Sequence, residues 1–305
     1  MIKRLTAVLL CLCFFCFSSV PVSGDVVNDF VVRVLEGDED GYTYNSGVLT
    51  FTSDGAYEVS MADGVDVATD VIVVASGVTA EVRINGLNID PSNDSAFSVA
   101  AGAVCELVLT GDSEFIETEA YANVHVPADA AITIVGEGSL NVINMSEGAG
   151  IGGGLTSSGG EIIINGGIIY AESDEGAGIG SGQYSGYTQN IGTKVTINGG
   201  TITAKALQGS GIGGGFRGIG GEVYIRGGSV ITTLPYFNAA AVTYTNPNFN
   251  VGANETPLTT SVSGALSIML SKMDNAVYPE PVELTASILD ASSPSGMAAI
   301  EAIDR

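Results

Sequence analysis

The 305-residue chain contains 34 acidic and 10 basic residues, and its formal net charge is −24 at pH 7. This charge argues against nucleic acids and anionic lipids as partners, because both require cationic patches on the protein. Cations, neutral glycans and basic proteins remain open as partners, and the acidity also favours solubility.

The first 24 residues have the features of a secretory signal peptide. Lys3 and Arg4 precede an apolar run over residues 5–22. Val22-Ser23-Gly24 then supplies small or tolerated residues before a cleavage point, so we expect a mature chain that begins at Asp25 and is secreted or held at the cell surface. A transmembrane helix is the weaker interpretation because the run is marginal in length. We expect no membrane contact after cleavage.

Residues 25–80 are interpreted as an N-terminal cap and a degenerate first coil, in which the strand pairs Leu49/Phe51 and Tyr57/Val59 flank the turn Asp54-Gly55. Downstream, each repeat has two alternating apolar residues and then a turn glycine. These glycines are Gly86, Gly111, Gly136, Gly166, Gly199 and Gly227. Their spacing of about 25–33 residues, with three strand-length phrases per repeat, favours a parallel β-helix over a propeller. Alternation at every second residue indicates strands, and stacked coils bury a continuous apolar core.

The apolar pairs before the turn glycines are expected to face inward and to stack on one another. They are Val82/Ile84, Leu107/Leu109, Ile132/Ile134, Ile162/Ile164, Val195/Ile197 and Val223/Ile225. Asn85, Asn165 and Asn198 would then share one ladder at the turn. Asn and Gly both tolerate the left-handed backbone that a tight turn needs, and we expect a positive φ at Gly199.

A glycine-rich phrase occurs three times, around Ile151, Ile179 and Ile212. It predicts a narrow strand with almost no outward side chains, and glycine in a strand often marks a close approach of another backbone or a ligand. The residues inserted after each copy map to one face of the solenoid, which is often the binding face.

The inserts carry the candidate carbohydrate-binding residues. These are Tyr184, Tyr187, Phe216 and Arg217. Aromatic rings on an exposed loop edge are suited to stacking against a sugar ring. The alternative is that the inserts fold back over the glycine-rich surface.

Glu147 and Glu175 stand immediately before two copies of the glycine phrase, and Gln208 takes the same place in the next coil. Carboxylates one coil apart lie ~4.8 Å from each other and repel unless a cation lies between them. With Asp174 they could supply the oxygen ligands of Ca²⁺. We therefore consider a weak calcium site at Glu147, Asp174 and Glu175, against the alternative that these side chains point into water. No other cofactor is expected.

The predicted fold class is all-β. It is a single-stranded, right-handed parallel β-helix of about six to seven three-strand coils, followed by a short β segment; its hand follows the rule for parallel crossovers. The helix spans residues 25–245, and residues 246–257 are interpreted as a linker because they are rich in Pro, Asn and Gly. Residues 258–305 are expected to be a partial β-sandwich-like segment, with a strand at Val282–Ile288.

We expect no catalytic activity. An enzyme on a β-helix would need clustered carboxylates on one strand face with a basic residue nearby. Glu81 and Glu106 lie in adjacent coils near Arg83. However, charged residues at the start of a strand are commonly just solvent-exposed side chains at the edge of a sheet. The only histidine, His125, has no partner suggested by the sequence. Motifs for zinc, phosphate or a nucleophile elbow are absent from the sequence.

The repeats resemble those of secreted surface proteins of anaerobic bacteria and archaea that are described as carbohydrate-binding-domain or adhesin-like proteins. The resemblance is carried by the Gly-Ala-Gly-Ile-Gly-Gly-Gly block at 148–154 and by Ile197–Ala204, and it covers about residues 42–233. Val282–Ile288 resembles the opening strand of bacterial immunoglobulin-like modules.

This resemblance implies a parallel β-helix and an adhesin-like, non-catalytic role. Cell-surface or plant-type polysaccharides would be the partners, and other surface proteins are further candidates. A purely structural stalk of a surface protein is the alternative. A polysaccharide lyase or hydrolase is the third possibility.

Overall fold

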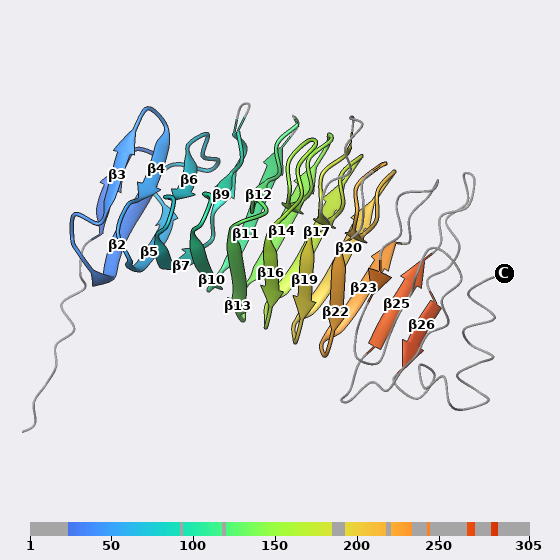
Figure 1. The fold of residues 1–305 in the computed structure, drawn as a ribbon. Helices are drawn as coiled ribbons and strands as arrows, with labels where there is room; N and C mark the ends of the chain where they lie inside the picture. Colours follow the sequence, from blue (N-terminus) through green and yellow to red (C-terminus); the bar gives the residue numbers. More distant parts are fainter. Residues whose placement is uncertain are drawn as a thin grey trace, which may run out of the picture.

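The computed structural model describes residues 24–91, 94–117, 120–184, 193–217 and 221–233, together with the backbone of three later strands. Residues 1–23 of the predicted signal peptide, the predicted linker at 246–257 and Tyr187 lie outside the described residues. The described strands stack along one axis as a parallel β-solenoid of about six turns (Figure 1). No helix long and apolar enough to cross a membrane occurs among the residues searched, which are the described ones.

Three sheets, named A, B and C, run along the solenoid. Sheet A contains, in spatial order, β1 (Asp25–Val27), β2 (Phe30–Gly37), β5 (Gly55–Met61), β7 (Thr79–Asn85), β10 (Val104–Leu109), β13 (Ala131–Gly136), β16 (Glu161–Ile164), β19 (Lys194–Ile197), β22 (Glu222–Ile225) and β24 (Thr243–Tyr244). Sheet B contains β3 (Tyr42–Asn45), β4 (Val48–Phe51), β6 (Val71–Val74), β9 (Phe97–Val99), β12 (Val124–His125), β15 (Ile151–Gly152), β18 (Ile179–Gly180) and β21 (Ile212–Gly213). Sheet C contains β8 (Asn88–Ile89), β11 (Asp112–Glu117), β14 (Ser139–Asn144), β17 (Ile168–Ser173), β20 (Thr201–Ala206), β23 (Ser229–Thr233), β25 (Ser267–Ser271) and β26 (Val282–Thr285).

Each full coil passes from sheet B to sheet A to sheet C, as in β15, β16 and β17. The predicted apolar pairs all face inward: every member of the six pairs is at most 1% exposed. The pairs of β16 and β19 stack as expected, since Ile162 and Ile164 pair with Val195 and Ile197. The apolar alternation therefore predicts the core of the solenoid correctly.

The register between β10 and β13 differs from the prediction by two residues. Leu107 pairs with Ile134, and Leu109 lies beside Gly136. Alignment on the turn glycines would have placed Leu107 beside Ile132. Side chains in a strand alternate with a period of two, so a shift of two residues leaves each of them on the same face. The apolar pattern cannot detect such a shift.

The asparagine ladder is correspondingly shorter than predicted. Asn198 Nδ2 donates to Asn165 Oδ1 at 2.8 Å, so these two residues stack as expected. Asn85 does not join them. Asn85 follows Ile84, which stacks with Leu109 and Gly136, whereas Asn165 follows Ile164, which stacks with Ile134. Asn85 therefore lies two residues further along the stack than Asn165.

The turn glycine with positive φ is the second of each Gly-Gly pair. Gly200 has a φ of 88°, and Gly167 and Gly228 both have 85°, whereas Gly199 is not among the residues with positive φ. The prediction for Gly199 was therefore wrong by one residue. Gly199 excludes a side chain for another reason: a Cβ there would lie 2.5 Å from the carbonyl oxygen of Asn165.

The first coil is offset by one strand from the prediction. Tyr57 and Val59 were expected after the turn, in the third phrase, with Gly55 as the turn glycine. In the structure Gly55 begins β5, and Tyr57 and Val59 pair with Val82 and Ile84 of β7 in sheet A. The reason is that Gly55 lies at the corner between sheets B and A, where other coils also place glycine.

The N-terminal end of the stack is covered by antiparallel strands. β2 pairs antiparallel with β5, and β3 pairs antiparallel with β4. The carboxylate of Asp70, only 4% exposed, accepts hydrogen bonds from Asn28 Nδ2 at 2.8 Å and from the Tyr44 hydroxyl at 2.9 Å. Because these donors come from the two antiparallel pairs and their links, Asp70 ties the cap to the first coils.

At the other end, β25 continues sheet C in parallel with β23, and β26 returns antiparallel to β25. β26 lies within the strand expected at Val282–Ile288. Apart from β25 and β26, the predicted sandwich-like segment at 258–305 lies outside the described residues.

Candidate functional site

Each glycine phrase folds into the same closed loop. The amide of Ala149 donates to the carbonyl of Gly153, that of Ala177 to Ser181, and that of Ser210 to Gly214, all at 2.9 Å. The loops stack so closely that a Cβ on Gly152 would lie 1.9 Å from the carbonyl oxygen of Gly180. The glycines are therefore required by the approach of neighbouring backbones, and they are buried.

The inserts begin by folding back against the corner between sheets C and B. The amides of Leu155, Gln183 and Phe216 donate to the carbonyls of Ala120, Glu147 and Glu175, at 2.9, 2.7 and 2.6 Å. This regular set of bonds corresponds to the alternative in which the inserts cover the glycine-rich phrases. It also fixes where the following side chains emerge.

Tyr184, Phe216 and Arg217 lie together on this corner, and we call them the insert ledge. The amide of Tyr184 donates to the carbonyl of Phe216 at 2.9 Å, which places neighbouring coils side by side. Both rings are partly exposed, and Arg217 is exposed. The Arg217 guanidinium carbon lies 5.0 Å from the centre of the Phe216 ring, within cation–π range. Three of the four sequence-predicted residues are thus brought together.

A polar network that the sequence did not predict adjoins the insert ledge. The Glu175 carboxylate accepts a hydrogen bond from the Gln183 amide and another from Gln208 Nε2, the latter at 3.2 Å. Gln183 directly precedes Tyr184 in the chain. The only signal in the sequence was that Gln208 takes the ladder position of Glu147 and Glu175.

The stack that motivated the calcium site is present, but its carboxylates also accept hydrogen bonds from neighbouring side chains. The Glu175 amide donates to the Ser146 carbonyl at 3.0 Å, which sets Glu175 beside Glu147 as predicted. However, the Ser146 hydroxyl donates to the Glu147 carboxylate, and glutamine amides occupy Glu175. Among the described residues no group of three or more His, Cys, Asp or Glu side chains could hold a metal ion. The calcium site at Glu147, Asp174 and Glu175 therefore stays a prediction.

Glu81 and Glu106 are neighbours in adjacent coils, as expected. Arg83 Nε lies 2.6 Å from Glu81 Oε1, and both side chains are partly exposed on the outer face of sheet A. This ion pair already satisfies one of the two carboxylates. The arrangement is that of a solvated surface pair.

His125 lies in sheet B between Ser98 and Gly152, and its Nδ1 is 3.4 Å from the Ser98 hydroxyl oxygen. Burial lowers the pKa of His125, and the nearby charge of Asp94 partly opposes this effect. In the pH range just below the unfolded pKa of about 6.5, the unfolded chain then binds more protons than the folded chain.

We therefore expect His125 to lower the stability of the fold as the pH falls through about 6.5. Since it is the only histidine of the chain, its imidazole pKa can be read directly by NMR. The measured pKa should lie below about 6.5 and fall further in Asp94→Asn. An imidazole pKa above 6.5 would contradict the described burial.

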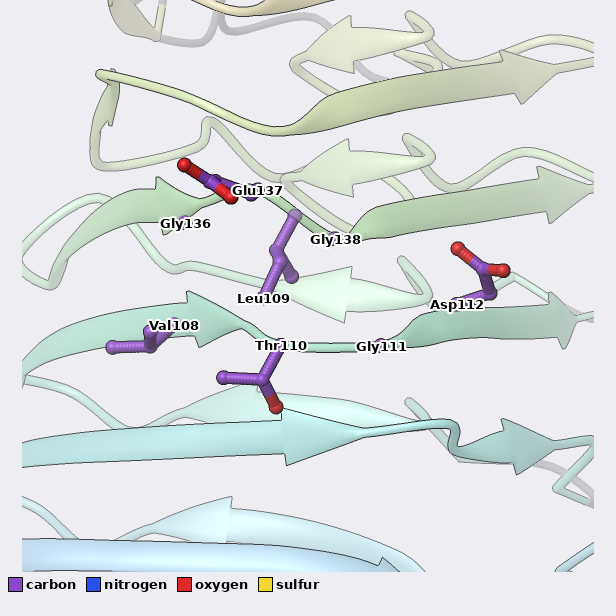
Figure 2. Close-up of a pocket in the computed structure, with 8 residues that line it drawn as sticks. All are labelled: Val108, Leu109, Thr110, Gly111, Asp112, Gly136, Glu137 and Gly138. Carbon is purple, nitrogen blue, oxygen red and sulfur yellow. The ribbon is translucent and has the colours of Figure 1, made fainter.

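A hollow of about 570 Å³ lies at the corner between sheets A and C, lined by residues 108–112 and 136–138 (Figure 2). We call it the corner hollow. It is formed by the turns that join β10 to β11 and β13 to β14. No pattern in the sequence indicates this hollow, because it depends on the register between β10 and β13.

A family model described as a beta helix repeat matches residues 162–183 and 195–216. Each matched segment runs from a sheet A strand through sheet C and the glycine phrase to the start of an insert. The fold and these matches define a parallel β-solenoid with beta helix repeats. Comparisons with curated proteins and with solved structures gave no significant match.

Proposed function

We propose that this β-solenoid is a secreted or surface-exposed, non-catalytic protein that binds carbohydrate through the insert ledge. The observation that carries the proposal is the pair of partly exposed rings, Tyr184 and Phe216, presented by neighbouring coils beside Arg217. Aromatic faces pack against the apolar face of a sugar ring, and planar polar side chains bind its hydroxyl groups.

The setting of the insert ledge supports this proposal. The hydrogen bonds from Gln183 and Phe216 to the preceding coil fix the first insert residues on a rigid stack. Gln183, Gln208 and Glu175 supply amide and carboxylate groups next to the rings. A preorganised surface loses less conformational entropy on binding than a mobile loop does.

The proposed partner is a cell-surface or plant-type polysaccharide, with other surface proteins as further partners. The leader-like first 24 residues support secretion, and the strongly acidic composition argues against nucleic acids. No cofactor is required for binding of this kind.

Retention on insoluble polysaccharide tests the proposal. We expect the purified protein to be retained on cellulose or pectin, and Tyr184→Ala/Phe216→Ala to weaken binding at least ~10-fold, because both stacking surfaces are lost. The matched control is Tyr170→Ala/Tyr224→Ala, which removes two partly exposed rings from strands of sheets C and A, away from the insert ledge, and should bind normally.

Equal retention of wild type and the ledge variant would exclude the insert ledge as the binding surface. Absence of retention on a broad glycan panel would favour the alternative function, a structural or adhesive stalk. The uniform stacking of the coils is the observation that favours a stalk.

A further inference from the structure

The insert ledge continues into a third coil. The first insert residues of three successive coils stack in one column, because their amides donate to carbonyls four residues before β12, β15 and β18. The second insert residues stack beside them: the Thr156 amide donates to the Gln183 carbonyl at 2.8 Å, just as the Tyr184 amide donates to that of Phe216. The first column is Leu155, Gln183 and Phe216, and the second column is Thr156, Tyr184 and Arg217. We call these six residues the extended ledge.

The extended ledge begins at Leu155. The coil before it has no insert, since only residues 126–130 join β12 to β13, and the Ala130 amide closes a turn there by donating to the Pro127 carbonyl at 2.9 Å. All six side chains of the extended ledge are at least partly exposed. A ligand that contacts all three coils must therefore run along the solenoid axis.

Each coil contributes one apolar and one polar side chain to the extended ledge, and their order alternates along the axis. The apolar member lies in the first column in the outer two coils and in the second column in the middle coil. The backbone alternates in the same way, because Thr156 and Arg217 have left-handed φ values of 58° and 57°, whereas Tyr184 between them does not. The pairs, apolar member first, are Leu155/Thr156, Tyr184/Gln183 and Phe216/Arg217.

This alternation matches a linear sugar chain in which every second unit is turned over. Successive coils are ~4.8 Å apart, and one unit of an extended β-1,4-linked glucan advances by nearly the same length. Each unit is rotated by half a turn relative to the one before, so its polar edge changes sides at every step. Because the substituents of a β-glucose ring are all equatorial, both faces of the ring are apolar and either face can pack on Leu155, Tyr184 or Phe216.

We propose that the extended ledge binds a linear β-1,4-linked glucan along the solenoid axis, with one glucose unit per coil. The inference rests on the proposed function and adds Leu155 as a third apolar contact. Two units pack on Tyr184 and Phe216, and the next unit packs on Leu155. The polar member of each pair binds the hydroxyl groups at the edge of its unit. An α-1,4-linked glucan curls, so it does not present three units in a straight row.

Calorimetric titration with cellobiose, cellotriose and maltotriose tests the proposal. Cellotriose is expected to bind at least ~5-fold more tightly than cellobiose, because its third unit reaches Leu155. It should exceed maltotriose by a similar factor, since maltotriose contains the same three glucose units with α linkages. Leu155→Ala should bind cellotriose no more tightly than cellobiose, while its affinity for cellobiose stays that of wild type. The unchanged affinity for cellobiose shows that this variant is folded.

Ile168→Ala is the control, because it truncates an apolar side chain that is 57% exposed on sheet C, and it should keep the preference for cellotriose. Equal binding of cellobiose and cellotriose, equal binding of cellotriose and maltotriose, or an unchanged preference in Leu155→Ala would overturn the proposal.

The two proposals can fail separately. If neither cello-oligosaccharide binds but the protein is retained on another polysaccharide through Tyr184 and Phe216, the insert ledge is a carbohydrate site and the β-1,4-glucan assignment is wrong. If Tyr184→Ala/Phe216→Ala changes neither the retention nor the titrations, the insert ledge is not the binding surface and both proposals fail.

Discussion

Gly180→Ala is expected to destabilise the solenoid by more than ~3 kcal/mol. A Cβ on Gly180 would lie 1.9 Å from the carbonyl oxygen of Gly213, and the φ of Gly180 is 148°, a conformation that other residues rarely adopt. Backbone strain of this kind costs about 1–3 kcal/mol by itself, and the overlap with a fixed backbone adds to it. The free energy of unfolding should be measured by urea denaturation.

Gly77→Ala is the matched control. Gly77 also has a positive φ, 76°, but a Cβ there would meet nothing within 4 Å. Only the left-handed backbone is then strained, which costs roughly 1–2 kcal/mol. If both substitutions reduced the free energy of unfolding equally, the close approach of β18 and β21 would not be the reason for glycine at position 180.

Ile169→Ala should reduce the free energy of unfolding by about 2–5 kcal/mol, because it removes a buried side chain and leaves a cavity. Ile169 is 1% exposed in β17, and its neighbours in the stack, Leu140 and Ile202, keep the cavity from collapsing. Chemical denaturation with the slope held fixed gives the difference.

The adjacent residue provides the control for this prediction. Ile168 is 57% exposed on the outer face of the same strand. Ile168→Ala is expected to change the free energy of unfolding by no more than about 0.5 kcal/mol. Comparable losses from the two isoleucines would mean that the inward and outward faces of β17 had been assigned wrongly.

The sequence is sufficient to predict the solenoid because its core signal is repeated in every coil. Ile162, Ile164, Val195 and Ile197 alternate with outward residues, and the same alternation recurs on either side. The glycine phrase was also interpretable, since glycine at the place of Gly180 indicates that another backbone lies close. These features depend on local pattern and on repetition.

Features that depend on register and on single hydrogen bonds were not predictable. The pairing of Leu109 with Gly136 preserves the face of every side chain, so no apolar pattern distinguishes it from the alternative. The corner hollow follows from this pairing and was missed with it. Likewise, the hydrogen bonds from the amides of Gln183 and Gln208 to Glu175 depend on side-chain placement, which the repeat pattern does not specify.

The antiparallel strands at the N-terminal end have a consequence for self-association. A stack of parallel strands ends in open edges, and such edges are templates on which further strands polymerise into fibres. Here β3 runs against β4, so a second molecule that approached sheet B at this end would meet a strand of the opposite direction, and in sheet A the reversed strand β2 interrupts the parallel stack. The outermost strand, β1, is three residues long and begins with Asp25, and sheet C ends in the two-residue β8. This end of the molecule is therefore a poor seed for amyloid-like growth.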